Sequence, residues 1–224
     1  MSRPYFRQVP NFEYISRNKD EQYISNYDNV KNLFKRGKIR EDIFGDLSFF
    51  TKYQVVGDER PDNVAYKFYS ESSLDWVVLL SNNILNIQTE WPMTQITFDR
   101  YLLEKYGDYD TLYNGVHHYE TEEILNGNGL VIVPKGLEVA QGYSITYYDS
   151  GLGQEVTKSN IAYEVTNYDY ENQIQEDKRN IYVLKPIYLN TLFNDLENIM
   201  PYKKGGDQYV NSTLKKGDNI RLFE

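Results

Sequence analysis

The only two histidines of the 224-residue chain are adjacent, and they are its best candidates for metal or acid–base chemistry. On a helix, His118 and Glu122 would share a face; on a strand, His118, Glu120 and Glu122 would do so. No cysteine or third histidine exists to complete a zinc site, and His117 and His118 would point apart on a strand. We therefore favour structural hydrogen bonding over a metal site.

Other signatures of catalysis are missing from the sequence. There is no G-x-S-x-G pattern and no Walker lysine, and Gly127-Asn128-Gly129 lacks the spacing of a dinucleotide loop. Carboxylates are too common here for their presence to indicate paired-acid hydrolysis. Without cysteine, disulfides and thiolate catalysis are excluded. We expect no enzyme and no cofactor.

Charge and composition limit the kinds of partner and the location that the chain can have. A net charge of −9 disfavours nucleic acid binding, and no apolar run reaches the length of a membrane span. The N-terminus lacks the apolar region of a signal peptide, so we expect a soluble protein made in the cytoplasm. The chain has 22 tyrosines, 10 phenylalanines and 2 tryptophans. This richness fits a partly wet protein interface, or tyrosine replacing other apolar residues in an ordinary core.

The order of helix and strand patterns along the chain predicts an α+β protein in four segments. We expect an N-terminal arm at 1–48, a core with a following helix at 49–114, a β-rich insertion at 115–184, and a helix and tail at 185–224. In the arm, Pro4 and Pro10 break any early helix, and residues 29–36 could form a short amphipathic turn. Its aromatic residues either pack on their own domain or meet a partner, and the candidates are Tyr5, Phe6, Phe12 and Tyr14.

The segment 49–92 predicts a strand and two helices. The strand ends at Gly57-Asp58, and Pro61 opens the first helix. Residues 70–73 form a break with good N-cap residues before a second helix over 74–81. The side chains expected in a common core are Tyr53, Val55, Val64, Ala65, Phe68, Trp76, Val77 and Leu80.

Beyond the core, a helix is expected from about residue 94 until Gly107 stops it. Strands are expected at 130–133, 143–148, 163–165 and 181–184, with a loop at 149–153. These strands are most simply explained as a hairpin-based insertion.

A late helix over 186–200 has a narrow apolar stripe. The stripe is either intramolecular core or a docking face, and its members are Leu189, Leu192, Phe193, Leu196, Ile199 and Met200. The tail beyond it is the one locally basic region, with Lys203, Lys204, Lys215, Lys216 and Arg221. It is either a solvated tail or an arm that docks on an acidic neighbour.

The core segment resembles a LysM module, through YQVVGD at 53–58, PDNVAYKFY at 61–69 and LDWVVLLSNNI at 74–84. The resemblance implies a β-α-α-β architecture. The closing strand of that family does not follow at its usual distance, and the nearest candidate is GLVIVP at 129–134. That strand is therefore either degenerate or displaced by an insertion.

More specifically, residues 61–84 with Trp76 and Trp91 resemble the LysM-containing baseplate wedge subunit of T4-like, contractile-tailed bacteriophages. The aromatic arm at 5–14 and the helix at 189–200 are similar to parts of the same family. The resemblance implies a structural subunit of the virion tail baseplate, assembled in the host cytoplasm and present in multiple copies. It would join neighbouring wedges as the baseplate ring closes, with other wedge proteins as partners.

Two alternatives remain. A LysM-type module could bind peptidoglycan during infection, through a groove between residues 57–61 and 82–87, and even the structural role leaves room for weak glycan contact. A phage lytic enzyme is the third hypothesis, and no catalytic constellation supports it.

Overall fold

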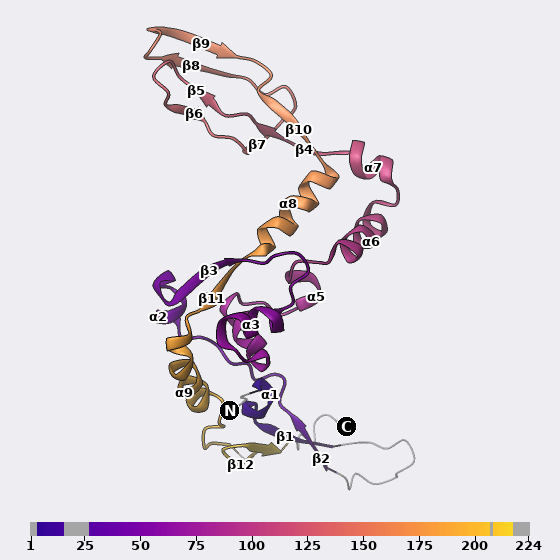
Figure 1. The fold of residues 1–224 in the computed structure, drawn as a ribbon, viewed down its shortest axis with the longest axis vertical. Helices are drawn as coiled ribbons and strands as arrows, with labels where there is room; N and C mark the ends of the chain where they lie inside the picture. The colour runs from indigo at the N-terminus through magenta and orange to yellow at the C-terminus, as the bar shows by residue number, and fades with distance from the viewer. Residues whose placement is uncertain (1–3, 16–26, 207, 217–224) are drawn as a thin grey trace. The chain divides into compact units, whose positions relative to one another are not determined.

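A computed structural model describes residues 4–15, 27–206 and 208–216 of the chain. The protein is a mixed α+β structure, which confirms the predicted class (Figure 1). It divides into two compact units. Unit 1 comprises residues 1–91 and 180–224, and unit 2 comprises residues 92–179. Among the described residues, no helix combines the length and apolar character needed to span a membrane.

Unit 1 contains the elements that precede the insertion and those that follow it. Its helices are α1 (Tyr5–Gln8), α2 (Glu41–Phe44), α3 (Pro61–Tyr69), α4 (Asp75–Ser81), α5 (Ile87–Glu90) and α9 (Leu189–Ile199). Short 3-10 turns lie at Leu47–Phe49, Ser72–Leu74 and Pro186–Tyr188. Its strands are β1 (Asn11–Ile15), β2 (Tyr27–Lys31), β3 (Phe50–Gln54), β11 (Asn180–Leu184), β12 (Tyr209–Asn211) and β13 (Leu214–Lys216).

The centre of unit 1 is a β-α-α-β arrangement of β3, α3, α4 and β11. Strands β3 and β11 lie side by side and antiparallel, with Phe50 opposite Leu184 (Figure 1). The strand that completes the arrangement therefore comes after residues 92–179, which are inserted between the second helix and its strand. The expected candidate at 129–134 lies instead in unit 2, and residues 181–184 belong to this core rather than to the sheet of the insertion.

Local chemistry explains where the two central helices begin and end. Pro61 occupies the first turn of α3, where no N–H is needed, and Ser70 ends that helix in the left-handed conformation at φ 57°. The expected side-chain cap of the second helix does not form. A 3-10 turn leads directly into α4, so Leu74 occupies the N-cap position without a capping hydrogen bond.

Asn82 fastens the end of α4 to the closing strand. Its side-chain oxygen accepts from the Tyr182 N–H at 2.7 Å, and its amide donates to the Tyr182 carbonyl at 2.8 Å. The amide also donates to the carbonyl of Val78 at 2.8 Å. The Asn82 side chain thus pairs with both backbone polar groups of Tyr182, as a neighbouring strand would.

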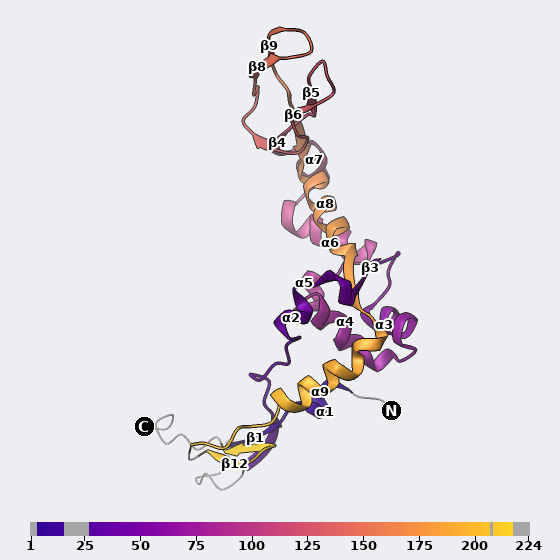
Figure 2. The same ribbon diagram turned by 90° about the vertical axis from the view of Figure 1, so that its left-hand side faces the viewer.

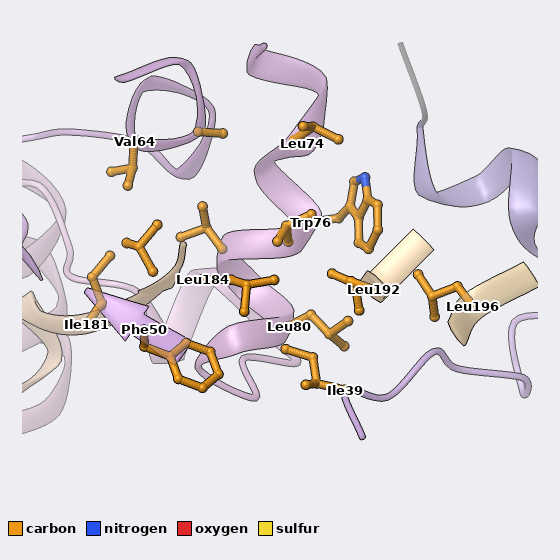
Figure 3. Packing of buried hydrophobic residues seen from close by; sticks show 14 of the residues in the cluster. Ile39, Phe50, Val64, Leu74, Trp76, Leu80, Ile181, Leu184, Leu192 and Leu196 are labelled. Atoms are coloured by element: carbon orange, nitrogen blue, oxygen red, sulfur yellow. The ribbon is translucent and has the colours of Figure 1, made fainter. Parts of the chain in front are cut away.

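The core of unit 1 gathers apolar side chains from all of these elements. Figure 3 shows Val64, Leu74, Trp76 and Leu80 from the helical layer together with Phe50, Ile181 and Leu184 from the two strands. Leu192 and Leu196 of α9 join the same cluster, with Ile39 below them. Burying these apolar groups is the main source of stability for the unit.

A four-stranded sheet, ordered β12-β13-β1-β2, forms a second part of unit 1 (Figure 2). Strand β1 pairs antiparallel with β2 and parallel with β13. The expected amphipathic turn at 29–36 is therefore wrong, because β2 takes residues up to Lys31 into the sheet. The turn that follows leaves Leu33 and Phe34 exposed, at 72% and 101%.

Unit 2 begins with helices and continues into short strands. Its helices are α6 (Gln95–Tyr106), α7 (Tyr109–Asn114) and α8 (Asn167–Arg179). Its strands are β4 (Val116–Thr121), β5 (Ile124–Leu125), β6 (Val131–Val133), β7 (Glu138–Val139), β8 (Ile145–Asp149), β9 (Gln154–Lys158) and β10 (Ala162–Thr166). They form one sheet ordered β10-β4-β7 and two hairpins, β5–β6 and β8–β9.

Helix α8 was not expected, and its packing is unusually polar. Its buried side chains are Glu171 and Gln175. Glu171 accepts hydrogen bonds from Lys105 and from the Tyr106 hydroxyl at 2.9 Å, which ties α8 to α6. The Lys105–Glu171 hydrogen bond holds the pKa of the lysine above its usual value. The described part of unit 2 thus combines a small apolar cluster with a satisfied polar network.

A second polar contact joins the two hairpins of unit 2. Asp149 is buried and accepts hydrogen bonds from the backbone N–H groups of Gly127, Gly151 and Leu152 at 2.9 to 3.2 Å. A Cβ on Gly151 would lie 2.7 Å from the carbonyl carbon of Gly127. Glycine is therefore required where these two backbones meet.

Candidate protein interface

The histidine pair lies on β4 and makes local contacts. His118 Nε2 is 3.1 Å from Glu120 Oε1, and His117 stacks on the ring of Tyr170 at 3.8 Å. Contrary to expectation, the two rings do not point apart, since their Nδ1 atoms are 2.9 Å from each other. No group of three potential metal ligands occurs among the described residues. The pair therefore offers hydrogen bonding and stacking.

Glu120 connects the histidines to the neighbouring strand. The Tyr163 hydroxyl on β10 donates to Glu120 Oε2 at 2.6 Å. This bond and the one from His118 lower the pKa of Glu120. The same bond, together with burial of the phenol, raises the pKa of Tyr163 to about 12. The group is a structural cross-strand contact with coupled titrations.

The eight residues expected in the central core are all found there. Six are buried: Val55, Val64, Ala65, Trp76, Val77 and Leu80. The other two, Tyr53 and Phe68, are partly buried and pack edge to face with ring centroids 5.2 Å apart. These side chains hold unit 1 together.

The late helix is divided between core and surface. Four of its six candidate interface residues are buried within unit 1: Leu192, Phe193, Leu196 and Met200. Leu189 is partly buried against the same core, and Ile199 is 43% exposed. The structure places the buried four in the core of unit 1, the first of the two alternatives for the stripe, and Ile199 is its most exposed member.

The aromatic arm is divided in the same way. Tyr5 lies on the core, with its ring centroid 5.6 Å from that of Trp76, and its hydroxyl accepts from the Gly37 N–H at 2.8 Å. Phe6 is 58% exposed. On β1, Phe12 is partly buried and Tyr14 is 56% exposed. Tyr5 thus anchors the arm, while Phe6 and Tyr14 face outward.

An apolar groove of about 550 Å³ lies where the arm meets α4. Its walls come from the arm, the turn after β2, α4 and the segment that follows α4. The lining residues are Pro4, Tyr5, Phe6, Val9, Leu33, Lys35, Arg36, Ser73, Asp75, Trp76, Leu79, Leu80, Ile84 and Leu85. A second hollow of about 570 Å³ shares Arg36 and Leu80 with it and extends to Phe44 on α2. The two hollows of unit 1 therefore adjoin each other.

The residues that line this groove were only partly foreseen. Phe6 was a candidate, whereas Leu33 and Leu85, exposed at 72% and 68%, were not. Each stands beside a second large apolar residue, Phe34 and Ile84 respectively, in a segment that is otherwise mostly polar. The signal that could have identified them is such an apolar pair within a polar loop. Exposed apolar side chains gathered around a groove are typical of a protein-binding surface.

The protein-family comparison identifies the class of protein. Residues 6–128, more than half of the chain, match the family described as base plate wedge protein 53. The chain belongs to this family. A comparison with curated proteins finds no matching sequence. As a member of the base plate wedge protein 53 family, the chain is a structural subunit of a phage tail baseplate and associates with other baseplate components.

Proposed function

We propose that the chain is a non-enzymatic connector that joins neighbouring wedges as the baseplate ring closes. The observation that carries the proposal is the apolar groove, because three exposed side chains, Phe6, Leu33 and Leu85, gather at its edge. Such side chains are costly to leave in water and gain when a partner covers them. A wedge protein 53 family member has its partners in the baseplate, so another wedge component is the natural occupant.

The proposal is tested by assembling wedges with and without the chain. We expect purified wedge components to close into rings only when it is present, as seen by electron microscopy and sedimentation. The double substitution Phe6→Ser/Leu85→Ser should reduce closure, while the matched pair Val116→Ser/Leu130→Ser, exposed on unit 2, should not. If rings close normally without the chain, the connector function is refuted.

The resemblance also leads us to propose that β3, α3, α4 and β11 form a LysM-like module in a T4-like, contractile tail assembled in the host cytoplasm. The order of elements and the antiparallel pairing of β3 with β11 support the module. In this proposal the module serves as a packing unit. The indole N–H of buried Trp91 donates to the Glu59 carbonyl at 2.9 Å. Internal packing thus already uses one of the loops at which a glycan would bind.

Peptidoglycan binding is the alternative that the same β-α-α-β arrangement raises. Incubation of the full chain with purified peptidoglycan, followed by sedimentation, separates the two functions. We expect no saturable binding. Strong saturable binding, lost on substitution within residues 57–61 or 82–87, would contradict a purely structural role.

A further inference from the structure

A cluster of lysines surrounds a buried tyrosine in unit 1. Tyr202 is 8% exposed, and the Lys35 and Lys215 ammonium groups lie 5.0 and 5.1 Å from the centroid of its ring. The Tyr202 hydroxyl accepts from the Asn32 amide at 2.8 Å, and Lys35 Nζ donates to the Pro201 carbonyl at 2.8 Å. The aromatic ring and the carbonyl thus hold two cations in defined positions.

Strand pairing brings these cations together from distant parts of the chain. Lys35 follows the turn after β2, whereas Lys215 lies on β13. The parallel pairing of β1 with β13 joins the two ends of unit 1 (Figure 2). The Tyr202 N–H donates to the Ser212 carbonyl at 2.7 Å, which fixes the segment that also carries Lys203.

Among the described residues, no acidic side chain neutralises the lysines of this cluster. Lys38 and Lys67 each pair with a glutamate elsewhere in unit 1, whereas no carboxylate lies within ion-pair distance of Lys35, Lys203 or Lys215 in the described ranges. Burial, then Lys215 and Lys203, lower the pKa of Lys35. Like charges held together in this way gain from an anionic partner. On a chain with net charge −9, this local cluster is opposite in sign to the whole.

The cluster continues into the apolar groove, because Lys35 also lines it together with Arg36. A partner there would meet an apolar floor, which includes Trp76 and Ile84, and a cationic edge. We propose that this surface binds an acidic protein segment of another wedge component. Its apolar side chains would enter the groove, and its carboxylates would lie beside Lys35, Lys203 and Lys215.

The inference rests on the proposed connector function and adds the chemistry of the partner. Carboxylates suit the site because ammonium groups act as point charges and impose no planar, bidentate geometry. The apolar groove beside them favours a protein segment over the phosphate backbone of a nucleic acid, which has no apolar side chains to fill it.

The test uses charge reversal in the full chain within the wedge-assembly assay. The variant Lys35→Glu/Lys203→Glu/Lys215→Glu should weaken binding to the wedge components by at least about tenfold. The control Lys52→Glu/Lys135→Glu/Lys158→Glu changes the net charge equally at exposed positions outside the cluster and should bind normally. A conservative variant, with arginine at the same three cluster positions, should retain binding because it keeps the charge. Unchanged circular dichroism and tryptophan emission would show that each variant is folded.

The outcomes separate this inference from the connector function. If rings need the chain but close normally with the cluster variant, the acidic-partner inference fails and the connector function stands. If rings close without the chain, the connector function itself fails. Equal losses in the cluster and control variants would also refute the inference, because net charge alone would then explain the effect.

A direct binding measurement identifies the partner chemistry. The probe is a synthetic amphipathic peptide of glutamate and leucine, compared with the same peptide carrying lysine in place of glutamate. We expect the acidic peptide alone to bind, more weakly at high salt. Stronger binding of duplex DNA would refute a protein partner. Binding seen only after Asp20, Glu21, Asp218 and Glu224 are neutralised would refute it too, since the chain's own acids would then cover the lysines.

Discussion

Truncation of Leu196 tests whether the stripe of α9 is core or interface. Leu196 is fully buried, and a Cβ on Gly37 would lie 2.6 Å from its Cδ2 atom, so the two segments are in close contact. Leu196→Ala removes buried methyl groups and leaves a cavity, which costs about 3 to 5 kcal/mol in well-packed cores. Ile199 lies one turn away, is 43% exposed, and should lose less than about 0.5 kcal/mol as alanine.

The assay can follow unit 1 separately. Both tryptophans, Trp76 and Trp91, lie in unit 1 and are buried, so tryptophan emission during urea unfolding reports on that unit. With a urea dependence of about 2 kcal/mol per molar, a loss of about 3 kcal/mol lowers the midpoint by about 1.5 M. Ile199→Ala should leave the midpoint within about 0.3 M of the parent chain.

Two results would refute this reasoning. A midpoint for Leu196→Ala within about 0.3 M of the parent chain would show that the residue is not in a tight core. An equal shift for Ile199→Ala would show that the exposed side of α9 is also packed within the isolated chain.

Four other experiments test the polar contacts. Asn82→Ala removes the hydrogen bonds to the Tyr182 backbone and should lower the free energy of unfolding of unit 1 by about 2 kcal/mol. Tryptophan emission during urea unfolding measures this, and an unchanged midpoint would contradict a stabilising role for the Asn82 hydrogen bonds. Glu171→Gln weakens the buried hydrogen-bond network of unit 2 and should destabilise that unit by about 2 kcal/mol. The value is smaller than for a fully buried ion pair because Lys105 is partly solvated. Faster hydrogen exchange within residues 95–106 and 167–179 would show the loss. Glu120, whose folded pKa is depressed, should stabilise the fold above the ordinary glutamate pKa and lose this effect as pH falls through the folded value. NMR titration should show it ionising below the ordinary glutamate range. Tyr163 should contribute below the ordinary tyrosine pKa and lose the effect between about pH 10 and 12, and Glu120→Gln should bring its tyrosinate absorbance transition back toward the ordinary range.

Local patterns predicted most of unit 1. Pro61 and the stripe containing Val64 and Phe68 indicated α3, and the spacing of Leu192 and Leu196 indicated α9. These signals depend on residues within a few turns of each other, so a sequence displays them directly. The pairing of β3 with β11 depends instead on residues more than a hundred positions apart, and no local pattern specifies it.

Helix α8 could not be predicted by apolar periodicity. Its sequence NYDYENQIQEDKR is polar on most faces, and its buried members are a glutamate and a glutamine. These residues become internal only because Lys105 and the tyrosines of α6 satisfy Glu171. A prediction that places only apolar residues in the interior cannot identify a helix whose buried side chains are polar.

The candidate interface shows the same limit. The aromatic arm and the apolar stripe were visible in the sequence, but their division into buried and exposed members was not. Lys35 and Lys215 stand 180 positions apart and become neighbours only through the four-stranded sheet. The lysines of the tail are visible in the sequence, whereas their proximity to Lys35 and to the groove depends on the tertiary structure.

The late position of β11 has a consequence for biosynthesis. When β3 leaves the ribosome, its partner strand has not been made, and more than a hundred residues must be translated first. At roughly 5 to 20 residues per second, that interval is on the order of 10 s. During it the apolar faces of α3 and α4 have neither β11 nor α9 to cover them. These faces therefore stay uncovered until nearly the whole chain has emerged, and premature termination anywhere before β11 yields a product that cannot complete unit 1.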